Sequence, residues 1–203
     1  MSVNLQKGQK VDLTKGNSGL SKIIVGLGWD AVAHTGAKGL FSSLLGKNTA
    51  DVDCDASVLM INNLGKLNNI ENVIYFGHLK SSCGSVTHTG DNMTGDGDGD
   101  DEQILVDLLK IPADIDKLIF VVTIYDCVNR HQDFGMINNA FIRVVNTSGN
   151  QELLKYNLSE NYAGKTSLII GEIYRNNSEW KFSATGEGTN DASLKAIIGR
   201  YTK

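Results

Sequence analysis

Short runs of β-branched and aromatic residues, separated by Gly, Asn and Asp, recur along most of this chain and leave little room for long helices. Such residues fit the pleated surface of a sheet better than the side of a helix. The clearest runs cover residues 22–30, 56–61, 73–76, 118–125, 141–145, 167–174 and 180–184. We expect eight or more short strands in all. Without alternating long helices, they predict an all-β fold, specifically a β-sandwich.

Two parts of this pattern carry a more specific prediction. Residues 118–125 are apolar apart from Thr123, which is typical of a central strand that is buried on both faces. Residues 175–179 are a polar connection between the runs at 167–174 and 180–184. We therefore predict that these two strands pair as a hairpin.

Signals for helices are few and short. Residues 38–45 are expected to form one or two turns within a loop, and residues 112–116 a single turn before the strand at 118. Near the C-terminus, Leu194, Ile197 and Ile198 recur at helical spacing, and Asp191 is a suitable N-cap. A short peripheral helix is therefore predicted within residues 191–201.

The chain has 203 residues, 41% of them hydrophobic, which is enough for one domain with a full core, and no internal repeat divides it. We therefore expect a single domain over residues 1–203. The first residues lack the apolar stretch of a signal peptide, and the longest apolar run has eight residues, far fewer than a membrane span needs. Three widely spaced cysteines predict reduced core thiols rather than disulfides. These features predict a cytoplasmic protein without a membrane span.

Negative charge is concentrated in one interval of the chain. No Lys or Arg occurs between Lys80 and Lys110, whereas seven acids do, so the formal net charge of −4 divides into −7 here and +3 elsewhere. The acids are Asp91, Asp96, Asp98, Asp100, Asp101, Glu102 and Asp107. This interval would repel phosphates, which argues against nucleic acid as a partner and favours a cation.

In the middle of this interval, acids alternate with Gly95, Gly97 and Gly99. Two acids at this spacing lie roughly 6–7 Å apart in an extended chain. They repel by about 0.6 kcal/mol in water but by about 2–3 kcal/mol at an effective dielectric constant near 20, so an ordered loop requires a countercharge. Glycines let the backbone present carbonyl oxygens, and Ca²⁺ prefers carboxylate and carbonyl oxygens. Because His and Cys are scarce here, zinc is disfavoured and calcium is predicted.

Two known calcium motifs do not fit this loop. Asp96, Asp98 and Asp100 match the first ligand positions of an EF-hand, but the sixth position must be Gly and is Asp101. The flanking segments are also predicted strands rather than helices. The Gly/Asp nonapeptide of calcium β-rolls does not recur. The spacing suits a loop at the rim of a β-sandwich instead.

A second acidic cluster precedes the strand predicted at 56–61. Asp51, Asp53 and Asp55 alternate, so in a strand their carboxylates share one face. Asp30 and Asp126 end other predicted strands. Acids at strand ends suit a metal-binding rim, and the alternative is that they are solvated surface groups or turn residues. The four histidines are scattered and are expected to be structural rather than catalytic.

Ordered blocks along nearly the whole chain resemble the signature of the TerD-type tellurium-resistance and stress-response family. In the N-terminal half they read GLGWD at 26–30, DCDAS at 53–57, HTGDNMTG at 88–95 and GDDEQ at 99–103. In the C-terminal half they read FVVTIYD at 120–126, FG at 134–135, NAFIRVV at 139–145, GEIYR at 171–175 and WKF at 180–182. The stretch 35–50 departs from the family pattern because it is longer and more apolar.

The resemblance implies a β-sandwich that binds two Ca²⁺ ions without known catalysis and serves tolerance to tellurite and general stress. It also implies that the partners are other proteins of a stress complex at the inner face of the membrane. The metal ligands that it points to are Asp30, Asp53, Asp55, Asp91, Asn92, Asp96, Asp98, Asp100, Asp101 and Glu102.

Two other functions are compatible with clustered carboxylates. A Ca²⁺-dependent hydrolase would use two of them as acid and base, although so many acids on one flexible loop suit an ion better than a spaced catalytic pair. A module resembling C2 domains would dock on anionic lipids through bridging Ca²⁺. The leading hypothesis remains a non-enzymatic calcium-binding module.

Overall fold

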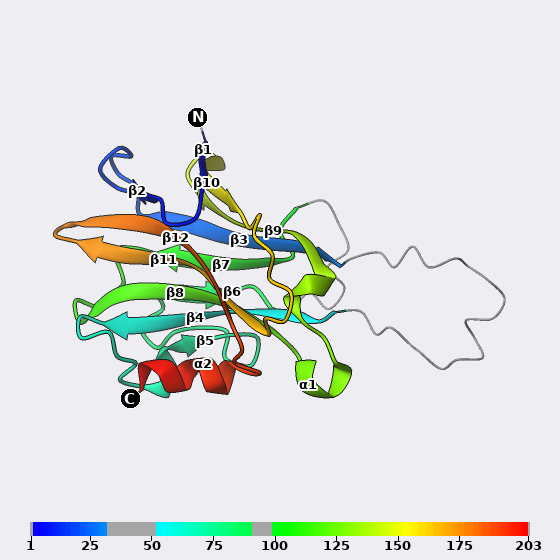
Figure 1. Ribbon diagram of the computed structural model, residues 1–203. Helices are drawn as coiled ribbons and strands as arrows, with labels where there is room; N and C mark the ends of the chain where they lie inside the picture. The colour runs from blue at the N-terminus through cyan, green and yellow to red at the C-terminus, as the bar shows by residue number, and fades with distance from the viewer. Residues whose placement is uncertain (1, 32–51, 91–98, 203) are drawn as a thin grey trace, which may run out of the picture.

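The computed structural model describes residues 2–31, 52–90 and 99–202, which form two six-stranded sheets packed face to face (Figure 1). Sheet A has the order β1 (Val3–Leu5), β10 (Gln151–Asn157), β9 (Ile137–Asn146), β3 (Lys22–Ala31), β7 (Glu102–Asp107) and β6 (Val86–His88). Sheet B has the order β2 (Lys10–Asp12), β12 (Glu179–Thr189), β11 (Ser167–Asn176), β8 (Ile115–Ile124), β4 (Cys54–Asn62) and β5 (Val73–Ile74). Neighbouring strands are antiparallel except β1 and β10.

The inner faces of the two sheets share one hydrophobic core. Sheet A contributes side chains such as Leu27 and Ile142, and sheet B contributes Val58, Phe120 and Phe182, all without measurable exposure. Alternate residues of each strand point inward, as the two-residue period of a strand requires. The predicted all-β sandwich is therefore confirmed.

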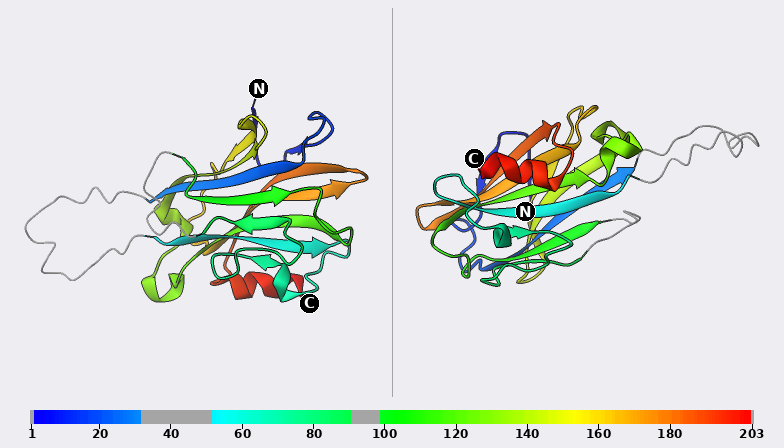
Figure 2. Two further views of the ribbon diagram at one scale, coloured as in Figure 1. Left: turned by 180° about the vertical axis from the view of Figure 1, so that it is seen from behind. Right: turned by 90° about the horizontal axis from the view of Figure 1, so that it is seen from below.

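The predicted central strand is also confirmed. β8 lies between β11 and β4, and Leu118 to Ile124 are buried without interruption. Phe120 points into the sandwich core, whereas Ile119 and Val121 belong to a second apolar cluster with Ile197 of α2 (Leu194–Tyr201). α2 thus covers part of the outer face of sheet B (Figure 2), which is why both faces of β8 are apolar.

Two local predictions need correction. The N-cap of α2 is Ser193, whose side chain accepts a hydrogen bond from the backbone N–H of Ala196, and not Asp191. The β11–β12 connection is two residues, because Asn176 pairs directly with Glu179 and the polar residues predicted as loop continue the ladder. Asn177 makes this tight turn with a φ of 59°.

Several strands were not predicted from the sequence, namely β1, β2, β6, β7 and β10, and β5 is shorter than expected. The other helical elements are α1 (Cys127–Arg130) and the 3₁₀ turns η2 (Ile70–Asn72) and η3 (Phe134–Met136). The turn predicted at 112–116 is present as a hydrogen bond from the N–H of Ile115 to the carbonyl of Pro112. The helix predicted at 38–45 lies outside the described residues. Within the described ranges, no helix has the length and apolarity that a membrane crossing requires.

The cysteines differ in their surroundings. Cys54 and Cys127 are buried and reduced as predicted, but Cys83 is exposed and so is not a core thiol. Partial burial raises the pKa of Cys83, but hydrogen bonds with the hydroxyls of Ser81 and Ser85 outweigh it and bring that pKa below the usual value of a thiol.

We expect one equivalent of thiol to react with Ellman's reagent in the folded protein and three after unfolding, because a reactive thiol must be accessible and ionised. Cys83→Ser should remove the reactive equivalent, and Ser85→Ala should move the pH midpoint of the reaction upward. Reaction of two or more thiols before unfolding would contradict this assignment.

Candidate metal centre

Six of the ten predicted metal ligands lie in the described residues, and they lie toward one end of the sandwich. β3 ends there, and β7 begins beside it, with Leu27 opposite Glu102 (Figure 1). β4 begins at the same end, with Cys54 opposite Ile124 of β8. The six are Asp30, Asp53, Asp55, Asp100, Asp101 and Glu102. Asp91, Asn92, Asp96 and Asp98 lie outside the described residues.

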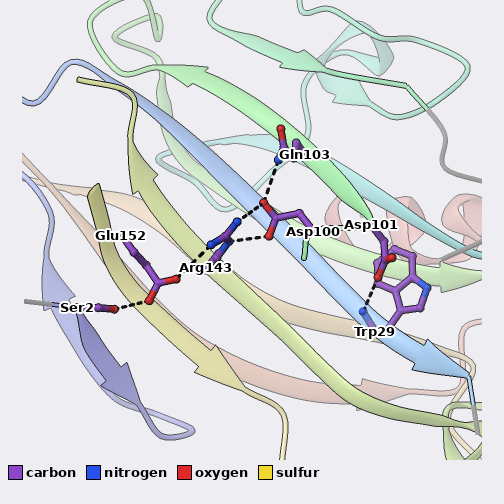
Figure 3. A network of polar contacts seen from close by, with 7 residues as sticks. All are labelled: Ser2, Trp29, Asp100, Asp101, Gln103, Arg143 and Glu152. Carbon is purple, nitrogen blue, oxygen red and sulfur yellow. Dashed lines mark hydrogen bonds and ion pairs between the residues drawn. The ribbon is translucent and has the colours of Figure 1, made fainter. Parts of the chain in front are cut away.

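Asp100 lies against the outer face of sheet A, and Arg143 of β9 neutralises it (Figure 3). Nε and Nη2 of Arg143 donate to the two carboxylate oxygens at 2.7 and 3.0 Å, and Gln103 Nε2 donates at 3.0 Å. The Asp100 side chain is only 1% exposed, because it packs on Gly26, where a Cβ atom would lie 2.2 Å from its carboxyl carbon. The countercharge for this acid is therefore an arginine, which sequence reasoning missed.

Asp101 accepts a hydrogen bond from β3 at a point where the strand pairing is irregular. The β3–β9 ladder shifts register between Gly28 and Asp30, and the backbone N–H of Trp29 donates instead to Asp101 Oδ2 at 2.6 Å (Figure 3). Burial raises the pKa of Asp101 against the effect of this hydrogen bond, and the charges of Asp30, Glu102 and Asp100 raise it further. Negative charge is thus in excess around Asp101.

Glu102 connects the two sheets. As the first residue of β7 it has the inward parity of Ile104 and Val106, and it is buried. Its Oε2 accepts a 2.6 Å hydrogen bond from the backbone N–H of Ala56 in β4 and lies 3.3 Å from His88 Nε2. The same ring nitrogen lies 3.2 Å from the carbonyl of Ala56. β5 pairs with β4 only at Val58 and Leu59. Glu102 and His88 therefore contact the backbone N–H and carbonyl of Ala56, which lies in β4 just before that pairing.

The strand-start acids approach the same region from sheet B. Asp53 precedes β4, and its carboxylate lies 4.0 Å from Arg130. Asp55 is buried opposite Thr123. Cys54, between them, points into the core, where burial raises the pKa of its thiol, as do the charges of Asp55, Asp53, Glu102 and Asp101. The charges of both acidic blocks therefore act in the same direction on the pKa of the Cys54 thiol.

Asp30 lines a cleft of about 540 Å³. Asn139 Nδ2 donates to its Oδ2 at 2.7 Å. The cleft is also lined by Trp29, Gly99 and Lys155, so the described end of the acidic loop borders it. Asp126 is exposed and is the N-cap residue that precedes α1, where its Oδ1 accepts from Asn129 Nδ2.

The described carboxylates share a region without forming a complete site. Among residues 2–31, 52–90 and 99–202, no group of three or more His, Cys, Asp or Glu side chains is arranged to hold a metal ion. Asp100, Asp101, Glu102 and Asp30 each accept a hydrogen bond from the protein's own groups, and among them Asp100 is the one that a guanidinium neutralises.

Comparisons with known proteins agree with these blocks. The TerD domain family model matches residues 1–201. The chain is 65% identical to stress response protein SCP2 of Bacillus subtilis over 99% of this chain and 100% of that protein. It is 44% identical to tellurium resistance protein TerD of Serratia marcescens over 99% of this chain and 97% of that protein.

Solved structures support the architecture. A crystal structure of a protein of unknown function has a TM-score of 0.67 at 20% identity and covers 91% of this chain and 99% of its own. A homologue of telluride resistance protein from Streptomyces coelicolor has a TM-score of 0.60 at 21% identity and covers 88% of this chain and 98% of its own. At these identities the likeness shows the fold.

Proposed function

Because the chain belongs to the TerD domain family of tellurium-resistance and stress-response proteins, we propose that it binds Ca²⁺ at the acidic end of the sandwich and acts without catalysis. The observation that carries the proposal is that six predicted ligand residues lie in or beside strand ends at this end of the sandwich. The eight residues between Gly90 and Gly99 add three carboxylates and one Asn to the same sequence block. So much negative charge in a compact region favours a divalent cation.

The contacts divide the predicted ligands into two groups. Asp100 and Glu102 are assigned to holding the ends of the acidic block, because the guanidinium of Arg143 neutralises Asp100 and the Glu102 side chain is inaccessible between the sheets. Asp30 and Asp101, with Asp53 just before β4 and Asp55 within it, are the described residues that would hold calcium, together with the acids of 91–98. We propose that two Ca²⁺ ions bind in this region. Bound Ca²⁺ would supply the countercharge that Asp101 lacks.

Asp100, Asp101 and Glu102, at and just before the start of β7, support a non-enzymatic role. Each accepts a hydrogen bond from the protein's own donors, whereas an acid–base pair must exchange protons with a substrate. We propose that the calcium-ordered end engages another protein of a cytoplasmic stress complex.

Calcium added to chelator-treated protein should raise the melting temperature by about 5–10 °C at a hundredfold excess over Kd, because a ligand that binds only the native state stabilises it. Calorimetry should give binding in the micromolar range or tighter. Absence of both effects would reject the proposal.

Asp101→Asn keeps an acceptor for the Trp29 N–H but removes the charge. It should therefore melt no lower than the unchanged protein in chelator, and it should lose most of the calcium-dependent rise. Asp114→Asn, an exposed acid elsewhere, is the matched control and should keep the full rise. An unchanged calcium response in Asp101→Asn would exclude Asp101 as a ligand.

A further inference from the structure

A pocket of about 490 Å³ lies where α2 stops covering the outer face of sheet B. Under the helix, the outward residues are apolar, such as Leu59 and Val121. Past the N-terminal end of the helix, the same face of β4 and β8 presents Asp55, Ser57 and Thr123, which line the pocket. The residues of this face change from apolar to polar where the helix ends its cover, so the polar residues are not needed for packing α2.

Ser57 is the observation that points to a ligand. Its side chain is buried, with 1% exposure for the residue, and its Oγ has no hydrogen-bond partner among the described residues. Buried hydroxyls normally have a partner, since desolvation without one is unfavourable. A group that enters the pocket would supply it.

One aromatic wall is held in place before any ligand binds. Tyr75 and His78 exchange backbone hydrogen bonds of 3.1 and 2.9 Å, which hold Phe76 at the tip of a tight turn. Gly77 is required there, because a Cβ atom would lie 2.6 Å from the Tyr75 ring. The two rings meet edge to face at 5.5 Å, and Phe76 remains 45% exposed.

The segment that follows β8 adds a third aromatic ring and more negative charge to the pocket lining. Tyr125 is 53% exposed, and Asp126 follows it. The guanidinium of Arg130 already lies over the Tyr125 ring, 5.0 Å from its centroid. Among the described lining residues, Asp55 and Asp126 are acidic and none is Lys, Arg or His. Carboxylates beside exposed aromatic faces attract organic cations.

We propose that this pocket binds an ammonium or guanidinium group carried on an aliphatic stem. The head would donate to Ser57 Oγ and the Asp55 carboxylate, and the stem would lie between Phe76 and Tyr125. A free polyamine and an Arg or Lys side chain of a partner polypeptide both present this chemistry. The inference does not rest on calcium binding, and since Asp55 is also a proposed calcium ligand, calcium and the organic cation would compete for that carboxylate.

The test is a titration of the whole chain, in chelator, with n-butylguanidinium, followed by amide NMR. The amide signals of Ser57, Phe76 and Tyr125 should shift together and saturate. The neutral isostere n-butylurea should produce little change. Equal shifts with butylurea, or no shifts with the cation, would overturn the proposal. Parallel titrations with spermidine and with acetyl-Gly-Arg-Gly-amide identify where the cation comes from. Tighter binding of spermidine indicates a free polyamine, and tighter binding of the peptide indicates a partner polypeptide.

Two variants separate binding from folding. Ser57→Ala should weaken butylguanidinium binding about fivefold, yet raise the melting temperature by about 2–4 °C, because it removes an unpartnered buried hydroxyl. Asp55→Asn should weaken binding about tenfold or more. Asp114→Asn should leave it unchanged. A Ser57→Ala variant that melts lower, or that binds as tightly as the unchanged protein, would contradict the assignment of Ser57.

Discussion

Glu102→Ala is expected to lower the free energy of unfolding by about 3–5 kcal/mol, even when calcium is absent. The Glu102 and His88 side chains are both inaccessible and lie 3.3 Å apart, and Oε2 of Glu102 holds the backbone N–H of Ala56. Truncation would leave that N–H buried without its acceptor and would remove the group that faces His88. The cost is large because water cannot replace the lost oxygen between two sheets.

Urea denaturation in chelator, followed by tryptophan fluorescence, measures this loss. Glu102→Gln is the matched control, because its amide oxygen still accepts from Ala56 while the charge is lost. We expect its destabilisation to be roughly half as large. If Glu102→Ala changed stability only when calcium was present, Glu102 would be a metal ligand and not the connection between the sheets.

Arg143→Ala is the second large effect, with an expected loss of about 2–4 kcal/mol. It leaves the Asp100 carboxylate, 1% exposed, without its bidentate partner on the face of Gly26. It also releases Glu152, which Arg143 Nη1 contacts at 3.4 Å and which accepts from Ser2 Oγ at 2.6 Å (Figure 3). Arg143 is itself one-third exposed, so solvent reduces the cost below that of a fully buried pair.

A double-mutant cycle tests this account. Asp100→Ala alone should cost less than Arg143→Ala, because the remaining arginine reaches water and Glu152. The double variant should recover much of the stability that Arg143→Ala loses, since no buried charge is left. Additive losses in the double variant would show that the pair contributes nothing beyond its separate contacts.

The strands that could be predicted are those with apolar, β-branched or aromatic residues over most of their length. β8 is the clearest, because a strand covered by the core on one side and by α2 on the other must be apolar at every position. β7 was missed because it begins with Glu102 inside the acidic run, where charge suggested a loop. The inward parity of Glu102 with Ile104 and Val106 was the available signal.

At the acidic end too, part of the arrangement was predictable from the sequence and part was not. That carboxylates from two separate blocks lie toward one rim was predictable, because strand ends meet at the ends of a sandwich. The prediction that the ordered loop requires a countercharge did not anticipate that Arg143 supplies one to Asp100. Nothing in the local sequence of either residue indicates that they are opposed across the face of β3.

By itself, the sequence determined the positions of the apolar strands and the concentration of negative charge, because β-propensity and charge are properties of short segments. Only the tertiary structure decided which donor each acid meets. Asp101 takes the N–H of Trp29, Glu102 that of Ala56, and Asp100 the guanidinium of Arg143. These partners lie 72, 46 and 43 residues away, and strand pairing and sheet packing bring them together.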